Sequence, residues 1–159
     1  MTSPREQSAV FDWLARSQAA PHQAHREWAE RGIALLPLGK RFNTVTLPAR
    51  LVHSGVGTDD LDAVATTLAE LFCGPVIHNR PQHQYSALVA PCPTPRWPYP
   101  EEAPMLGAGD FLSVPACDLT GPTGLYWAVR PCIVGDLCPV QSVAALVSIA
   151  RSKSGGRGR

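Results

Sequence analysis

Paired carboxylates are the first residues in this chain that suggest chemistry. Two acids spaced i and i+2 on a strand point the same way and can hold the metal ions of a nucleotidyl transferase. Asp60 and Asp62 have this spacing, but they lie at the start of a predicted helix, where such residues point about 200° apart. Both suit the positive end of the helix dipole. We interpret them as helix-capping residues, and the sequence predicts no catalytic residue, no metal ligands and no cofactor.

A second polar group lies between two predicted strands. The turn 79–82 is enclosed by two histidines and follows the short apolar segment 75–78. Loops at strand ends often carry binding sites, so this turn could form a ligand or partner surface, and the alternative is an ordinary hairpin turn. The residues of this candidate surface are His78, Asn79, Arg80 and His83.

The remaining histidines and the cysteines give weaker signals. His22 and His25 could share one face of a helix, with a solvated helix face as the alternative. The cysteines are odd in number and contain no C-x-x-C pair, which favours neither a disulfide framework nor a zinc ribbon. We expect most of them to be small buried side chains. The five are Cys73, Cys92, Cys117, Cys132 and Cys138.

Basic residues occur at two places that could contact phosphate. Gly39 is followed by a lysine and an arginine after a predicted strand, without the glycine-rich loop of a Walker site. The segment 151–159 holds four basic residues and no acid, whereas the rest of the chain has 10 basic and 13 acidic residues. A basic tail allows a weak electrostatic tether to DNA. The candidate phosphate contacts are Lys40, Arg41, Arg157 and Arg159.

The hydrophobic pattern predicts the elements that must position these residues. Helices are expected at 5–18, 21–31, 59–72 and from Pro139 onward, and strands at 33–36, 43–47, 75–78, 85–89, 111–114 and 125–129. Strands that follow one another directly, between spaced helices, indicate an α+β fold with helices packed on a mixed or antiparallel sheet. We expect one domain over residues 1–152 and a disordered basic tail over 153–159.

A proline-rich segment, residues 91–104, is predicted to be an extended surface loop because proline fixes φ and lacks a backbone donor. Trp97 and Tyr99 lie within it. These rings could dock into a partner protein, or they could fold back onto the domain.

Composition limits the class of protein. The apolar fraction is 45% and the net charge is +1, and the mean hydropathy is −0.04, which favours a soluble globular chain. No stretch reaches the roughly 20 apolar residues of a membrane span, and the N-terminal residues lack a secretory signal. We therefore expect a cytoplasmic protein. Only Lys40 and Lys153 of the 14 basic residues are lysine, a bias typical of high-GC actinomycete genomes.

Several short phrases occur in an order that resembles the small actinobacterial proteins of the bifunctional DNA primase/polymerase-like family, over about residues 28–151. They are Trp28 before the first strand, the phrase 42–49, Leu61-Asp62 in a helix, Gly74-Pro75-Val76, Gly107-Ala108-Gly109-Asp110, Ser113-Val114-Pro115, and a final helix ending at Ala150-Arg151. The resemblance implies an α+β domain that handles DNA or nucleotides. In active members, acidic pairs and a histidine hold the metals, but no predicted strand of this chain carries such a pair.

Our leading hypothesis is a non-catalytic accessory protein of DNA maintenance or plasmid transfer, similar to proteins that serve plasmid spread and conjugation in streptomycetes. It would act through protein partners of DNA transfer or replication, with weak DNA contact. One alternative is a DNA-binding module. Another is a metal-dependent nucleotidyl transferase whose site is assembled from distant acids, such as Asp110 or Asp118, with His78 or His83.

Overall fold

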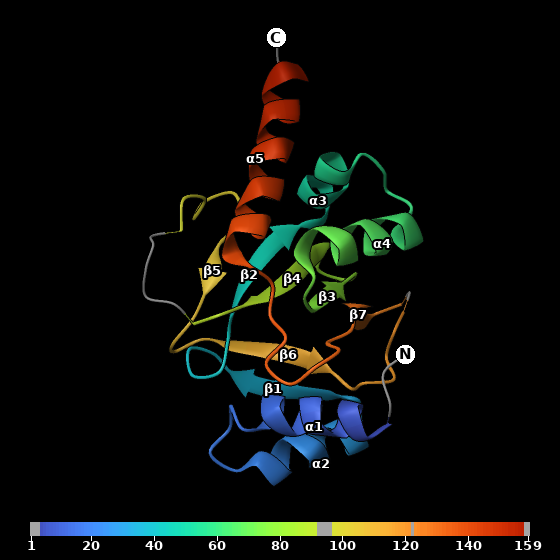
Figure 1. Cartoon of the computed structure of the whole chain (residues 1–159), viewed down its shortest axis with the longest axis vertical. Helices are drawn as coiled ribbons and strands as arrows, with labels where there is room; N and C mark the ends of the chain where they lie inside the picture. The colour runs from blue at the N-terminus through green and yellow to red at the C-terminus, as the bar shows by residue number, and fades with distance from the viewer. Residues whose placement is uncertain (1–3, 92–96, 122, 158–159) are drawn as a thin grey trace.

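The computed structural model describes residues 4–91, 97–121 and 123–157, and within them five helices and seven strands are defined (Figure 1). In chain order they are α1 (Pro4–Ala15), α2 (Pro21–Arg31), β1 (Ile33–Pro37), β2 (Asn43–Pro48), α3 (Ala49–Val56), α4 (Leu61–Phe72), β3 (Val76–Asn79), β4 (Gln84–Val89), β5 (Met105–Leu106), β6 (Phe111–Pro115), β7 (Leu125–Val129) and α5 (Val140–Arg157).

The strands form two antiparallel sheets, so the expected α+β class is confirmed. Five of the described strands make the large sheet in the order β5-β2-β4-β3-β7, and β1 pairs with β6 in a separate small sheet. Helices α3, α4 and α5 lie on one side of the large sheet. Helices α1 and α2 and the small sheet lie on the other side (Figure 1).

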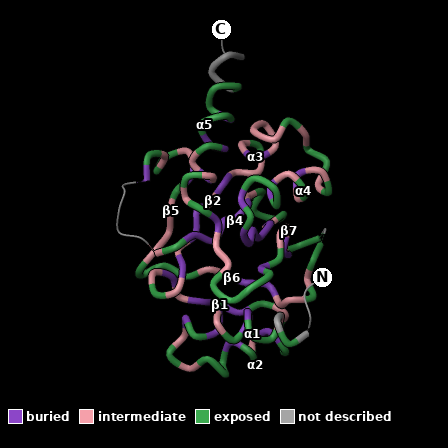
Figure 2. The backbone as a smooth tube through the Cα atoms, viewed as in Figure 1, coloured by how far each residue is buried: buried purple, intermediate pink, exposed green. Residues whose placement is uncertain are grey.

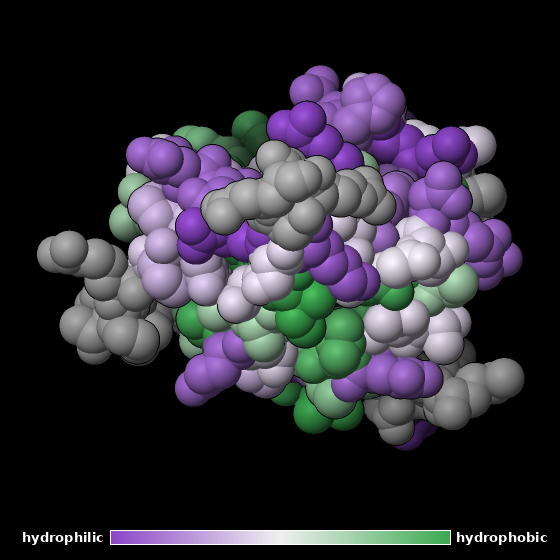
Figure 3. Space-filling view, turned by 90° about the horizontal axis from the view of Figure 1, so that it is seen from above, coloured by the Kyte–Doolittle hydropathy of each residue, from purple (hydrophilic) through white to green (hydrophobic). Residues whose placement is uncertain are grey.

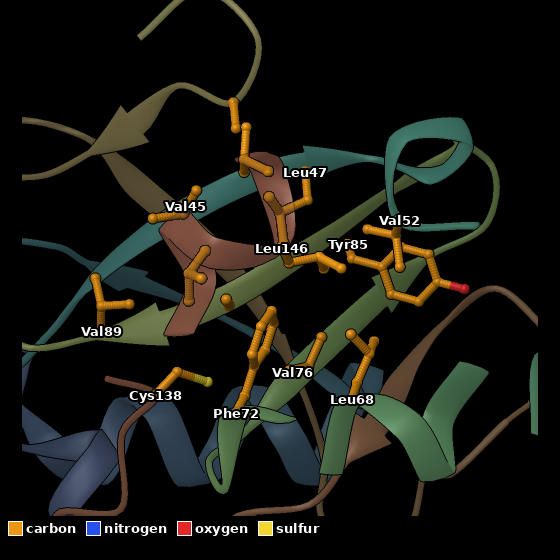
Figure 4. Close-up of a cluster of buried hydrophobic side chains, with 14 of the residues drawn as sticks. Val45, Leu47, Val52, Leu68, Phe72, Val76, Tyr85, Val89, Cys138 and Leu146 are labelled. Carbon is orange, nitrogen blue, oxygen red and sulfur yellow. The ribbon is translucent and has the colours of Figure 1, made fainter. Parts of the chain in front are cut away.

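The first core fills the space between the large sheet and helices α3, α4 and α5 (Figure 4). Val45 and Leu47 lie two positions apart on β2 and so share a face of the strand, and both are fully buried in this core. Leu68 and Phe72 of α4 and Leu146 of α5 contact the same layer. This packing fixes α3 and α5 side by side over the sheet.

The second core joins the opposite face of the large sheet to α1, α2 and the small sheet. Two buried tryptophans connect the layers through their indole N–H groups. Trp28 donates to the Val114 carbonyl over 2.9 Å, and Trp127 donates to the Pro115 carbonyl over 3.0 Å. Because both acceptors belong to β6, the small sheet is tied to α2 on one side and to β7 on the other.

Of the two aspartates at the start of α4, Asp60 caps the helix. The carboxylate of Asp60 accepts a hydrogen bond from the Ala63 N–H over 3.0 Å, and Asp62 lies in the first turn. This satisfies a backbone donor that the first turn of a helix leaves unpaired. The end of α2 also agrees with the sequence, since Gly32 closes it in the left-handed conformation with φ of 77°.

Three elements differ from the sequence-based prediction. Helix α3 was not expected; only Val52 of its eight residues is buried, and Gly55 weakens its helical pattern. The two-residue strand β5 follows directly after the predicted loop 91–104, at residues for which no strand was expected. Helix α5 continues to Arg157 and so runs into the segment from residue 153 that was expected to be a disordered tail.

The turns of α5 that contact the core carry buried residues, and the turn that follows them is exposed (Figure 2). Within the described residues, no helix combines the length and apolar character that crossing a membrane requires.

Candidate functional site

The most unusual polar group in the structure is a ring cluster on the face of the large sheet that α3 covers. Strand β3 places His78 opposite Tyr85 of β4 and opposite Tyr126 of β7. The imidazole of His78 stacks on the Tyr85 ring with 4.0 Å between centroids, and its Nδ1 lies 2.6 Å from the Tyr126 hydroxyl. From α3, His53 Nε2 lies 2.9 Å from the Tyr85 hydroxyl. Each member of the stacked pair His78–Tyr85 therefore also makes one His–Tyr hydrogen bond to a third or fourth ring.

Burial keeps this cluster uncharged. It lowers the pKa of His78 to about 4, and the nearby charges of His53 and Arg80 act in the same direction. Burial also raises the pKa values of the Tyr85 and Tyr126 hydroxyls. At neutral pH His78 is consequently neutral, and the protonated Tyr126 hydroxyl can donate to Nδ1.

The stability of the fold should therefore fall as the solution becomes acidic. An unfolded His78 takes up a proton below pH 6.5, whereas the folded residue does so only below about pH 4. Between these values acid favours the unfolded chain, and the pKa of His53, lowered by burial, adds to the effect. We expect a loss on the order of 2 kcal/mol between pH 7 and pH 4.

Urea unfolding at pH 7.5, 6 and 5 measures this dependence. His78→Gln should flatten the slope of unfolding free energy against pH, and the exposed control His22→Gln should leave it as in the wild type. Equal slopes for His78→Gln and the wild type would refute the assignment.

The predicted surface at residues 78–83 is divided between the interior and the outside. His78 is 3% exposed and points into the ring cluster. The turn itself joins β3 to β4 as a hairpin, in which Asn79 Oδ1 accepts from the Gln82 N–H over 3.2 Å. Arg80 and His83 are exposed, and the His83 carbonyl accepts from the first N–H of α3. The hairpin turn thus positions α3 over the sheet.

A basic groove lies between α3 and α5, in a region that the sequence pattern did not single out as a pocket. It has a volume of about 480 Å³ and is lined by two arginines, one acid and apolar residues of both helices. Arg151 contacts Glu102 over 3.4 Å and lies 5.3 Å from the Tyr99 ring centroid. Arg50 is exposed and, among the described residues, pairs with no acid. The groove therefore carries a guanidinium that a ligand can reach.

Lys153 and the absence of acidic residues from α5 extend the positive charge of this region. Lys153 Nζ donates to the carbonyls of Ser54 and Gly55 at the end of α3, over 3.0 Å and 3.5 Å. The sequence of α5 contains no acidic residue. Figure 3, which looks onto this end of the molecule, shows hydrophilic residues gathered around the helix end and an apolar patch to one side.

The predicted phosphate contacts do not form one surface. Lys40 and Arg41 lie in the turn between β1 and β2, beside the small sheet, while the end of α5 lies at the top of the view, beyond the large sheet (Figure 1). Lys40 is exposed and Arg41 is half-buried. Arg157 is the last residue of α5, with a side chain outside the described part, and Arg159 lies outside the described residues.

A cleft runs between α4 and the edge strand β7. Its wider part has a volume of about 720 Å³, and an adjoining part of about 190 Å³ reaches Tyr126 of the ring cluster. Asp62 and Arg130 both line the wider part, as does Gln7, whose Oε1 is buried without a hydrogen-bond partner. This cleft combines opposite charges with an apolar wall.

The other candidate residues are dispersed. His25 pairs with Asp12 over 2.8 Å on the exposed surface of α2. Asp110 Oδ2 accepts from the Gly107 N–H beside β6, away from the buried His78. Asp118 lies exposed after the same strand. Within the described part of the chain, no three His, Cys, Asp or Glu residues are grouped as metal ligands.

Burial of the cysteines was predicted incorrectly. The four described cysteines are free, but only Cys138 is buried, whereas Cys73 and Cys132 are exposed. Cys73 ends α4 in a left-handed conformation with φ of 51°, and Cys132 lies in the loop after β7. Cys92 lies outside the described residues. Position at a helix end or in a loop therefore outweighed the apolar character of the thiol.

The two aromatic residues of the proline-rich segment fold back onto the domain. Trp97 is 8% exposed, and its indole N–H donates to the Ala103 carbonyl over 2.6 Å. Tyr99 packs against Trp97 and the first core.

Comparison with known proteins adds no assignment: no family model, no curated protein and no solved structure matches this chain.

Proposed function

We propose that this chain is a non-catalytic accessory protein of DNA maintenance or plasmid transfer that contacts DNA through the basic groove between α3 and α5. The observation that carries the proposal is the pair Arg50 and Arg151, which lines one groove of about 480 Å³ from two different helices. Guanidinium groups bind phosphate oxygens with two parallel N–H donors.

The geometry favours the phosphate backbone over a buried small anion. The groove is open, each of its two helices carries an exposed arginine, and α5 extends away from the body beside it (Figure 1). A DNA strand can follow such a surface, with Lys153 of α5 along its path. The choice of DNA rather than another polyanion comes from the order of phrases that resembles primase/polymerase-like proteins.

The groove also contains a carboxylate that limits its affinity for phosphate. Glu102 pairs with Arg151 and brings a negative charge to the groove wall. A phosphate that approaches Arg151 must compete with this carboxylate. We therefore expect weak, salt-sensitive binding, as suits a protein that also relies on partners of DNA transfer or replication.

Binding to labelled duplex and single-stranded DNA across a salt series tests the proposal. With two or three phosphate contacts, the logarithm of the binding constant should fall with the logarithm of salt with a slope of about −2 to −3. Absence of binding to either DNA at low salt would overturn the DNA role. Incorporation of nucleotides in parallel samples with Mg²⁺ would overturn the non-catalytic assignment.

A further inference from the structure

We propose that the cleft between α4 and β7 binds a small zwitterion, a free amino acid or a short peptide with free termini. This cleft is separate from the basic groove, since α4 and β7 line one and α3 and α5 line the other. Its wider part, about 720 Å³, has the roughly 300–1,000 Å³ volume that is common among small-ligand sites.

Two unpaired opposite charges define the ligand. The Asp62 carboxylate and the Arg130 guanidinium line the same cleft. They do not form an ion pair with one another, and neither forms an ion pair with any other described residue. A ligand with an ammonium group at one end and a carboxylate at the other could form an ion pair with each of these side chains. Arg130 can hold the carboxylate with two parallel donors.

A buried acceptor supports the orientation of such a ligand. Gln7 Oε1 has lost its contact with water and has no hydrogen-bond partner within the described residues. Leaving a buried acceptor unpaired costs free energy, so a ligand N–H at this place would bind favourably. Amino acids and peptides supply such donors.

The wall of the cleft suits an apolar side chain. Ala65 of α4 and Ala128 and Val129 of β7 line the wider part, and Tyr126 lines the narrow part. The Tyr126 hydroxyl can donate its hydrogen to His78 Nδ1, and its oxygen lone pairs then remain able to accept a hydrogen bond from a ligand. An aliphatic amino acid therefore fits better than a highly polar one.

Amide NMR spectra of the full chain, titrated with chosen probes, test this inference. The zwitterionic probes are L-leucine and leucyl-leucine, which also separate a free amino acid from a peptide. Leucinamide lacks the carboxylate, and N-acetyl-leucine lacks the ammonium group. We expect amide shifts in α4 and β7 with at least one zwitterion and binding about tenfold weaker or more with both single-charge probes.

Variants of the two charged residues complete the test. Asp62→Asn and Arg130→Gln keep the size of each side chain and should each weaken zwitterion binding about tenfold, while Arg50→Gln in the basic groove should not change it. Unfolding curves and the amide spectrum show that each variant is folded. Absence of shifts with both zwitterions at about 10 mM would overturn the proposal. Equal binding by Asp62→Asn, Arg130→Gln and the wild type would also overturn it.

Discussion

Trp127→Ala is expected to lower the free energy of unfolding by about 3–5 kcal/mol, the largest effect of any single truncation in this chain. The side chain is 2% exposed and lies in the second core. Its ring meets Phe11 of α1 edge to face at 5.9 Å, and its indole N–H binds the Pro115 carbonyl of β6. Truncation would leave a cavity and an unpaired carbonyl where β7, the small sheet and α1 meet.

Urea unfolding of Trp127→Ala, Trp127→Phe and Trp13→Ala measures the contribution. Trp127→Phe should lose about 1–2 kcal/mol, because it keeps part of the ring contact but removes the indole donor. The control Trp13 also lies on the second core but is only half-buried, so its truncation should cost less than half as much as that of Trp127. Equal losses for the two alanine variants would contradict this role of Trp127.

Gly39→Ala should cost about 3 kcal/mol of unfolding free energy, because two separate penalties act at this position. The residue has φ of 97°, a conformation that side chains with Cβ rarely adopt. An added Cβ would also lie only 2.6 Å from the backbone of Ala108, which has little freedom to move. Gly39 lies in the turn that leads from the small sheet to the large sheet, so the clash acts where the two are connected.

The matched control is Gly109→Ala, which separates the two penalties. Gly109 has nearly the same φ, 95°, but an added Cβ meets no atom within 4 Å. This variant should lose only the strain component, about 1 kcal/mol. Thermal and urea unfolding of both variants would contradict the account if Gly109→Ala cost as much as Gly39→Ala.

Local sequence signals predicted those elements whose own residues determine them. Helix α4 has an apolar stripe and a capping aspartate, and α2 has a proline at its start and a glycine at its end. Such elements follow from propensity and periodicity. Helix α3 could not be predicted in this way, because the contacts that hold it, with α5 and with the hairpin turn that accepts from its first N–H, are tertiary.

The division of the strands into two sheets could not be predicted from the local hydrophobic pattern either. The small sheet pairs β1 with β6, which are far apart in the sequence, and alternation along a strand does not identify its partner. Each strand of the pair alternates buried and exposed residues in part, as with Ala34 and Leu35. This is compatible with either sheet, so only the tertiary structure distinguishes them.

Candidate sites were harder to predict than elements. His78 was considered for its position beside a polar turn, and its burial between Tyr85 and Tyr126 depends on strand register that the sequence leaves open. The basic groove combines Arg50 with Arg151, a hundred positions later in the chain. The segment 151–159, with four basic residues and no acid, is the one sequence signal that pointed toward this region.

The salt dependence of DNA affinity in variants of the basic groove tests most directly whether Arg50 and Arg151 bind DNA phosphates. Arg50→Gln should weaken binding and reduce the magnitude of the salt slope by about one, as expected for one lost phosphate contact, whereas Lys40→Gln in the distant turn should leave both unchanged. Glu102→Gln should strengthen binding, because it releases Arg151 from its ion pair. DNA affinity that is unchanged by Arg50→Gln and Glu102→Gln but reduced by Lys40→Gln would contradict the account.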